Sequence, residues 1–151
     1  MTHVPLDKTD IRLLTEIGFL GAGAGLPRTV EKLFRAMMVI RPRRAFAYIG
    51  LATTHLNQSD SAQALQVMQQ GVRMLGTAAP HASDDGSFDP VQDPAMMHTF
   101  HGLCLLANQR TSEAKQVLQY VLKLPPHPPA LRLARGLLGL PTEPLAAKES
   151  T

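Results

Sequence analysis

A 34-residue period constrains the fold of this chain more than any other feature of its sequence. Counted from Ile11, eight positions of one unit recur in a second unit that begins at Ala45. The same positions recur in a third unit from Ala95, after an insertion at residues 79–94. Periods of this length are the signature of supersecondary units that bury their apolar faces against one another. The sequence therefore predicts repeats at residues 11–44, 45–78 and 95–128.

Each repeat is expected to consist of two helices. Residues that favour helices dominate the chain, and no segment alternates apolar and polar residues as a half-buried strand does. Thr9, Ser59 and Thr111 are candidate N-caps, and prolines end several helices because their ring removes a hydrogen-bond donor. The pattern predicts an all-α fold with helices at residues 9–22, 28–40, 43–56, 60–75, 94–107, 111–123 and 129–139.

Small and bulky residues recur at fixed places in the repeat. The eighth and twentieth positions hold Gly18 and Val30, Ala52 and Ala64, and Gly102 and Ala114, while Phe34, Met68 and Leu118 are the bulky residues. This pattern resembles the tetratricopeptide repeat. The resemblance implies three helical hairpins in a single domain at residues 10–140, between flexible termini at 1–9 and 141–151. Because stacked repeats leave an apolar end, we expect the helix at 129–140 to cap the third hairpin.

The insertion at residues 79–94 contains four aspartates and no lysine or arginine. Its composition predicts a mobile acidic loop before the third hairpin. One interpretation is a connector that only improves solubility. The other is a flap over the groove, or a dock for a basic partner, with Phe88 as its anchor.

Catalytic and metal-binding motifs are not apparent. His98, His101 and Cys104 share one face of a predicted helix, but they form an incomplete ligand set, and an interhelical packing role is expected. The glycine-rich segment at residues 21–25 follows a helix and not a strand, which favours a turn over a phosphate-binding loop. We therefore predict no enzyme activity, no cofactor and no metal.

The charge and apolar pattern exclude several partner classes. The net charge of +3 and the arginines at 41, 43 and 44, without interleaved aromatic residues, argue against nucleic-acid binding. The chain has no apolar run long enough to span a membrane and no secretory signal pattern at its first residues. The single cysteine suits a reducing compartment. These features predict a cytoplasmic protein without membrane insertion.

The strongest candidate for a binding site is the concave groove that the first helices of tetratricopeptide hairpins line. Most of its large side chains are apolar, so the expected partner offers an apolar or amphipathic segment. The protein's own terminal segment, or a second copy of the chain, is the alternative occupant. The predicted groove residues are Phe19, Phe46, Ile49, Thr53, Leu56, Met96, Thr99, Leu103 and Leu106.

Two longer segments narrow the resemblance. LLTEIGFLGAG, and the stretch from VEKLFRAMM to AYIGLATTHLN and on to QALQVMQQGV, resemble the small chaperones of bacterial type III secretion systems, in the group that holds needle or filament subunits. The resemblance implies a cytoplasmic chaperone that covers an amphipathic helix of a secreted needle, filament or translocator subunit and keeps that subunit unpolymerised before export. It also implies a small helical co-chaperone or a homodimer as a further assembly partner. A tetratricopeptide scaffold or adaptor that binds an apparatus or regulatory protein is the alternative.

Overall fold

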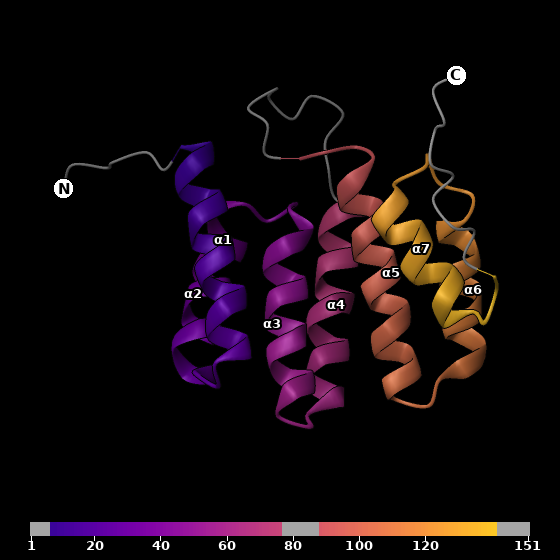
Figure 1. Cartoon of the computed structure of the whole chain (residues 1–151), viewed down its shortest axis with the longest axis horizontal. Helices are drawn as coiled ribbons and strands as arrows, with labels where there is room; N and C mark the ends of the chain where they lie inside the picture. Colours follow the sequence, from indigo (N-terminus) through magenta and orange to yellow (C-terminus); the bar gives the residue numbers. More distant parts are fainter. Residues whose placement is uncertain (1–6, 77–87, 142–151) are drawn as a thin grey trace, which may run out of the picture.

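The computed structural model describes residues 7–76 and 88–141, and these residues form seven α-helices and no strand. This confirms the predicted all-α fold. Each predicted helix is present, with both ends within two residues of the prediction. Figure 1 shows the pair α1 and α2 at one end of the molecule, then α3, α4 and α5, with α6 and α7 together at the other end. They are α1 (Lys8–Gly23), α2 (Pro27–Ile40), α3 (Ala45–Asn57), α4 (Ser61–Gly76), α5 (Gln92–Ala107), α6 (Thr111–Val121) and α7 (Pro128–Leu137).

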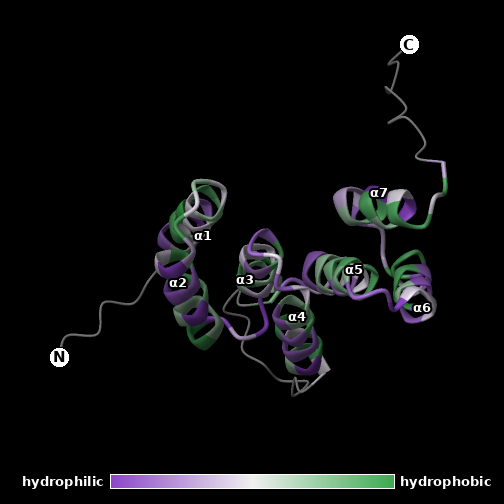
Figure 2. Cartoon of the chain, turned by 90° about the horizontal axis from the view of Figure 1, so that it is seen from below, coloured by the Kyte–Doolittle hydropathy of each residue, from purple (hydrophilic) through white to green (hydrophobic). Residues whose placement is uncertain are grey.

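The helices form two layers. Each helix packs against the next one in the chain, and the odd-numbered helices α1, α3, α5 and α7 also pack against one another in sequence. Among the described residues, α2, α4 and α6 make no such contacts with each other. The odd-numbered helices therefore form an inner layer and the even-numbered helices an outer layer. Figure 2 shows α1 and α7 on the same side of α3 and α5, so the inner layer is concave.

The turns within the successive helix pairs have the same geometry. Gly25, Ser59 and Gln109 occupy equivalent positions after α1, α3 and α5, and all three have a positive φ, of 75°, 60° and 60°. A hydrogen bond from the next amide to a carbonyl five residues earlier closes each helix: Leu26 to Gly21 (3.1 Å), Asp60 to His55 (2.9 Å) and Arg110 to Leu105 (2.9 Å). This left-handed residue and its hydrogen bond are a common way to end a helix.

Close packing between helices depends on small residues. Phe34 is fully buried, and its ring lies against Gly18 of α1 and Gly50 of α3. A Cβ atom at Gly50 would lie 2.1 Å from Phe34 Cζ, and one at Gly18 would lie 2.8 Å from it. The residues predicted at the small positions of the repeat are all buried. By contrast, none of the described side chains of α1 is fully buried.

The helix caps differ from the predicted ones. Asp7, and not Thr9, caps α1, because its carboxylate accepts a hydrogen bond from the Asp10 amide at 2.8 Å. Asp60, and not Ser59, accepts from the amide of Gln63 in the first turn of α4, at 3.1 Å. The predicted cap of α6, Thr111, is the first residue of that helix, and Arg110 before it makes no side-chain capping bond. Each of these carboxylates lies close enough to an amide in the first turn of its helix to accept a hydrogen bond from it.

The last helix, α7, packs against α5 and α6. Its buried residues are Ala130 and Ala134, and their small side chains bring the helix close to its neighbours. The helix ends at Leu137, where Gly139 has a positive φ of 71° and the Leu140 amide donates to Arg135 O at 2.9 Å. A short helix therefore packs on the last helix pair of the array.

Candidate functional site: a cleft on the inner layer

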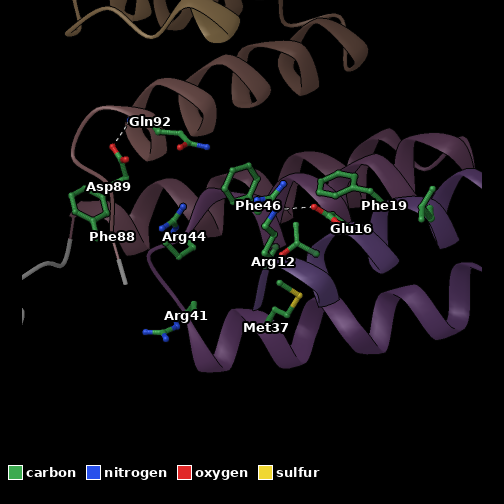
Figure 3. Close-up of a pocket in the computed structure, with 13 residues that line it drawn as sticks. Arg12, Glu16, Phe19, Met37, Arg41, Arg44, Phe46, Phe88, Asp89 and Gln92 are labelled. Atoms are coloured by element: carbon green, nitrogen blue, oxygen red, sulfur yellow. Dashed lines mark hydrogen bonds and ion pairs between the residues drawn. The ribbon is translucent and has the colours of Figure 1, made fainter. Parts of the chain in front are cut away.

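A cleft with a volume of about 1160 Å³ opens between α1, the end of α2, the start of α3 and the residues that lead into α5 (Figure 3). It lies on the inner layer, since α1, α3 and α5 contribute most of its lining. The lining residues are Arg12, Thr15, Glu16, Phe19, Leu20, Met37, Arg41, Arg44, Phe46, Ala47, Phe88, Asp89 and Gln92.

Aromatic side chains form much of the cleft wall. Phe19 comes from α1, Phe46 from the first turn of α3, and Phe88 from the segment before α5. The Phe19 ring packs edge-on against the buried ring of Phe34, with centroids 5.4 Å apart. Core packing therefore supports one wall of the cleft, and the half-buried rings offer apolar surface to a partner.

Charged side chains surround this apolar surface. Arg12 and Glu16 form an ion pair at 2.9 Å, but both side chains are exposed, so the pair adds little stability. Arg43 lies over the Phe88 ring, with its guanidinium carbon 3.9 Å from the ring centroid. This cation–π contact holds Phe88 at the edge of the cleft.

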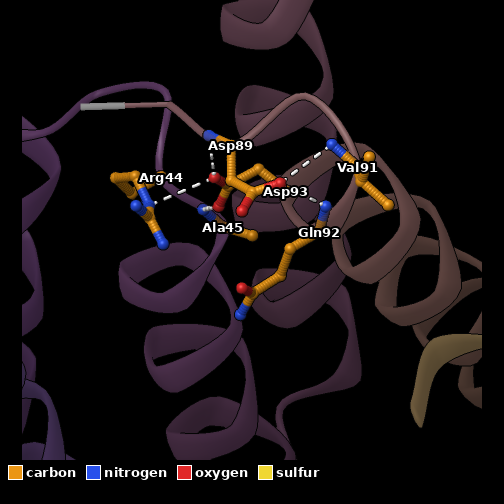
Figure 4. A network of polar contacts seen from close by, with 6 residues as sticks. All are labelled: Arg44, Ala45, Asp89, Val91, Gln92 and Asp93. Carbon is orange, nitrogen blue, oxygen red and sulfur yellow. Dashed lines mark hydrogen bonds and ion pairs between the residues drawn. The ribbon is translucent and has the colours of Figure 1, made fainter. Parts of the chain in front are cut away.

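A buried carboxylate fixes the junction behind the cleft (Figure 4). Asp93 is completely buried and accepts hydrogen bonds from the backbone amides of Ala45 at 2.7 Å and Asp89 at 2.8 Å. It also pairs with Arg44 at 3.1 Å. Burial raises the pKa of Asp93, while the two amide bonds and Arg44 oppose that rise. Asp93 thus caps α3 from a position 48 residues further along the chain.

A second carboxylate in the same segment binds the first amide of α5. Asp89 accepts hydrogen bonds from the amides of Val91 at 2.9 Å and Gln92 at 2.8 Å, and these bonds lower its pKa. The prediction of a loop over residues 79–94 is therefore wrong for residues 92–94, which begin α5; residues 88–91 lead into that helix without being part of it, and residues 79–87 lie outside the described part. The signal that was missed is Asp89, because an aspartate shortly before a helix can accept hydrogen bonds from the first amides of that helix, which have no partner within it.

The structure places two of the nine predicted groove residues, Phe19 and Phe46, in the lining of the cleft. The prediction is wrong for two others, because their side chains are buried and cannot line a groove. Ile49 is 3% exposed and Thr99 is 0% exposed, and the Thr99 hydroxyl donates to Ala95 O at 2.6 Å. Both lie on helices that have inner-layer neighbours on either side, so fewer of their faces remain open. The remaining five are half-buried and do not line this cleft: Thr53, Leu56, Met96, Leu103 and Leu106.

Periodicity could not locate several lining residues. Met37 and Arg41 come from the end of α2, and Phe88 and Asp89 come from the segment before α5. A repeat pattern describes equivalent positions on the helices, whereas these residues lie where particular connections meet. Composition, and not periodicity, singled out Phe88, because it is the one aromatic residue of the acidic insertion.

The histidines and the cysteine of α5 are largely buried against neighbouring helices. The His98 ring packs edge-on against Tyr120 of α6, with centroids 5.1 Å apart. Burial lowers the pKa of His98 and of His101 and raises the pKa of the fully buried Cys104 to about 12. Within the described residues, no three His, Cys, Asp or Glu side chains are grouped so that they could hold a metal ion.

Comparisons with protein-family models, curated proteins and solved structures gave no match. Within the described part of the chain, each helix is too short or too polar to cross a lipid bilayer. The cleft and the arrangement of the helices are therefore the features that bear on function.

Proposed function

We propose that this chain is a tetratricopeptide-repeat chaperone of a bacterial type III secretion system. It holds a secreted needle, filament or translocator subunit in the cytoplasm and prevents that subunit from polymerising before export. The observation that carries the proposal is the cleft on the inner layer, with its wall of three phenylalanines from three separate segments.

The helix arrangement supports the assignment to tetratricopeptide repeats. The turns at Gly25, Ser59 and Gln109 share one geometry, and equivalent small positions are buried at each helix pair. Contacts between alternate helices occur only on the inner side of the described array. Repeated pairs with a small constant rotation produce this type of concave surface.

The chemistry of the cleft suits an amphipathic helix. Such a helix presents apolar side chains at i, i+3, i+4 and i+7, and an apolar groove can cover that face. A subunit that assembles through this helix could not bind its siblings while the helix is covered. Apolar burial, at roughly 25 cal/mol per Å², supplies the affinity before ordering costs are subtracted. Binding is therefore expected to depend only weakly on salt.

The first experiment is native co-purification of the tagged protein from secretion-competent cells, with mass spectrometry of its partners and light scattering of the complex. Recovery of a small secreted subunit at fixed stoichiometry supports the chaperone. Recovery of apparatus or regulatory proteins alone contradicts it and favours the adaptor.

A matched pair of variants tests whether the cleft is the binding site. Phe46→Asp places a carboxylate in the cleft wall and is expected to abolish client binding, whereas Val39→Asp, on a side chain that is 82% exposed outside the cleft, is expected to preserve it. Circular dichroism checks that both variants remain helical. Phe88→Asp serves as a second cleft variant, since Phe88 precedes α5 and lies outside the helices. Unchanged binding by both cleft variants would place the site elsewhere.

A further inference from the structure

A second hollow lies on the outer layer, between α2 and α4, and has a volume of about 430 Å³. We call it the outer groove. Arg35 of α2 lines it on one side, and Arg73 with four glutamines of α4 lines the other: Gln63, Gln66, Gln69 and Gln70. Since the cleft lies on the inner layer, the two hollows can be occupied at the same time.

The lining of the outer groove is rich in hydrogen-bond donors. No carboxylate lines it. Each arginine offers five N–H donors and each glutamine amide offers two donors and an acceptor. Among the described residues, the side chains of the four glutamines have no hydrogen-bond partner and Arg73 forms no ion pair. Arg35 donates from Nε and Nη2 to one oxygen of Glu31, at 3.1 and 2.9 Å, which leaves its other donors for a ligand.

The surroundings of the outer groove are basic. Arg28 and Lys32 are exposed on the same face of α2 as Arg35, at a spacing of i, i+4 and i+7. Helix α4 contains no acidic residue, and the only one in α2 is Glu31. Arg73 is the basic residue of α4, so the two helices together carry four basic side chains and one carboxylate. This excess attracts negatively charged groups.

We propose that the outer groove binds an acidic segment of a partner protein. Carboxylates of the segment pair with Arg35 and Arg73, and its peptide groups exchange hydrogen bonds with the glutamine amides. Nucleic acid fits less well, because no aromatic side chain lines the hollow to stack on a base. A membrane surface also fits less well, because the only apolar residue of the lining, Val67, is 5% exposed. This binding does not depend on the function proposed for the cleft.

The test uses fluorescence anisotropy of a labelled short polyglutamate peptide with the full-length chain, at low and at high salt. We expect saturable binding that weakens as salt rises, since screening shortens the reach of surface charges to about 3 Å at 1 M. Arg35→Glu with Arg73→Glu is expected to weaken binding by about tenfold or more, because the pair removes two charge-assisted contacts and adds repulsion. Arg35→Gln with Arg73→Gln, which adds no repulsion, is expected to weaken it less.

The matched control is Lys115→Glu on α6 with Lys123→Glu in the turn after that helix, which changes the net charge equally at exposed positions outside the groove. Its affinity is expected to stay within about twofold of the wild type. An equal loss in the control pair would show nonspecific attraction and overturn the proposal. Tighter binding of a single-stranded oligothymidylate, or of phosphatidylserine vesicles, than of polyglutamate would overturn it as well.

Discussion

Replacing Asp93 by alanine tests the buried junction behind the cleft most directly. The substitution removes an acceptor from the amides of Ala45 and Asp89, which lie 2.7 and 2.8 Å from the carboxylate. It also leaves the guanidinium of Arg44, whose side chain is 25% exposed, without its ion pair to Asp93. The molecule would then hold two amides and a largely buried cation without this partner.

The magnitude follows from these three losses. Breaking a buried ion pair by removing one partner costs about 3–5 kcal/mol, and each unsatisfied buried donor costs about 1–3 kcal/mol. The three groups share one carboxylate, so these costs overlap, and Asp93→Ala is expected to lower the free energy of unfolding by about 4 kcal/mol. Asp93→Asn keeps one carbonyl acceptor for Ala45 and is expected to cost about half as much.

Urea unfolding at neutral pH, followed by circular dichroism because the chain has no tryptophan, measures these changes. With a slope of about 2 kcal/mol per M, the midpoint for Asp93→Ala should fall by about 2 M. Glu16→Ala, which breaks an exposed ion pair, is the control and should change stability by less than about 1 kcal/mol. A loss below about 1 kcal/mol for Asp93→Ala would refute the argument that this carboxylate ties α3 to α5.

Two further predictions concern the core and its titration. Gly50→Ala would place a Cβ atom 2.1 Å from Phe34 Cζ and is expected to cost about 1–3 kcal/mol in urea unfolding, since the buried ring must move. Because burial lowers the pKa of His98 and His101, the unfolded chain binds their protons first as the pH falls below the ordinary value of 6.5. The free energy of unfolding should therefore decrease as the pH falls below that value, and urea titrations at pH 7.5 and 5.5, chosen on either side of it, measure the difference.

The Gly50→Ala prediction and the histidine prediction each have a control variant. Gly23→Ala adds a Cβ with no neighbouring atom within 4 Å and should leave the urea midpoint nearly unchanged, so equal losses at Gly23 and Gly50 would contradict the packing argument. Replacing both histidines by glutamine should flatten the pH dependence in that window. A wild-type protein that gains stability between pH 7.5 and 5.5 would contradict the burial of neutral imidazoles.

The helices were predictable because their signals are local. Apolar spacing, proline and the small residues of each repeat located every described helix to within two residues. Caps were less predictable, since Thr9 and Asp7 are both good N-caps and only the three-dimensional position of each side chain decides between them.

The cleft was only partly predictable. Phe19 and Phe46 follow from their positions in the repeat, but Ile49 occupies a similar position and is buried by neighbouring helices. Asp93 was counted as a surface charge of an acidic loop. Its role depends on the amide of Ala45, which is distant in sequence, and no local pattern reveals that contact.

The absence of a fully buried described side chain in α1 has a consequence for motion. In an array of neighbouring units, each helix is stabilised mainly by the helices beside it, and segments with little buried apolar surface open at the lowest free energy. Helix α1 is therefore the element whose amides should exchange with solvent first, well before those of α3 and α5. Since α1 forms a whole wall of the cleft, the width of the cleft can adjust to different ligands without unfolding the core that supports it.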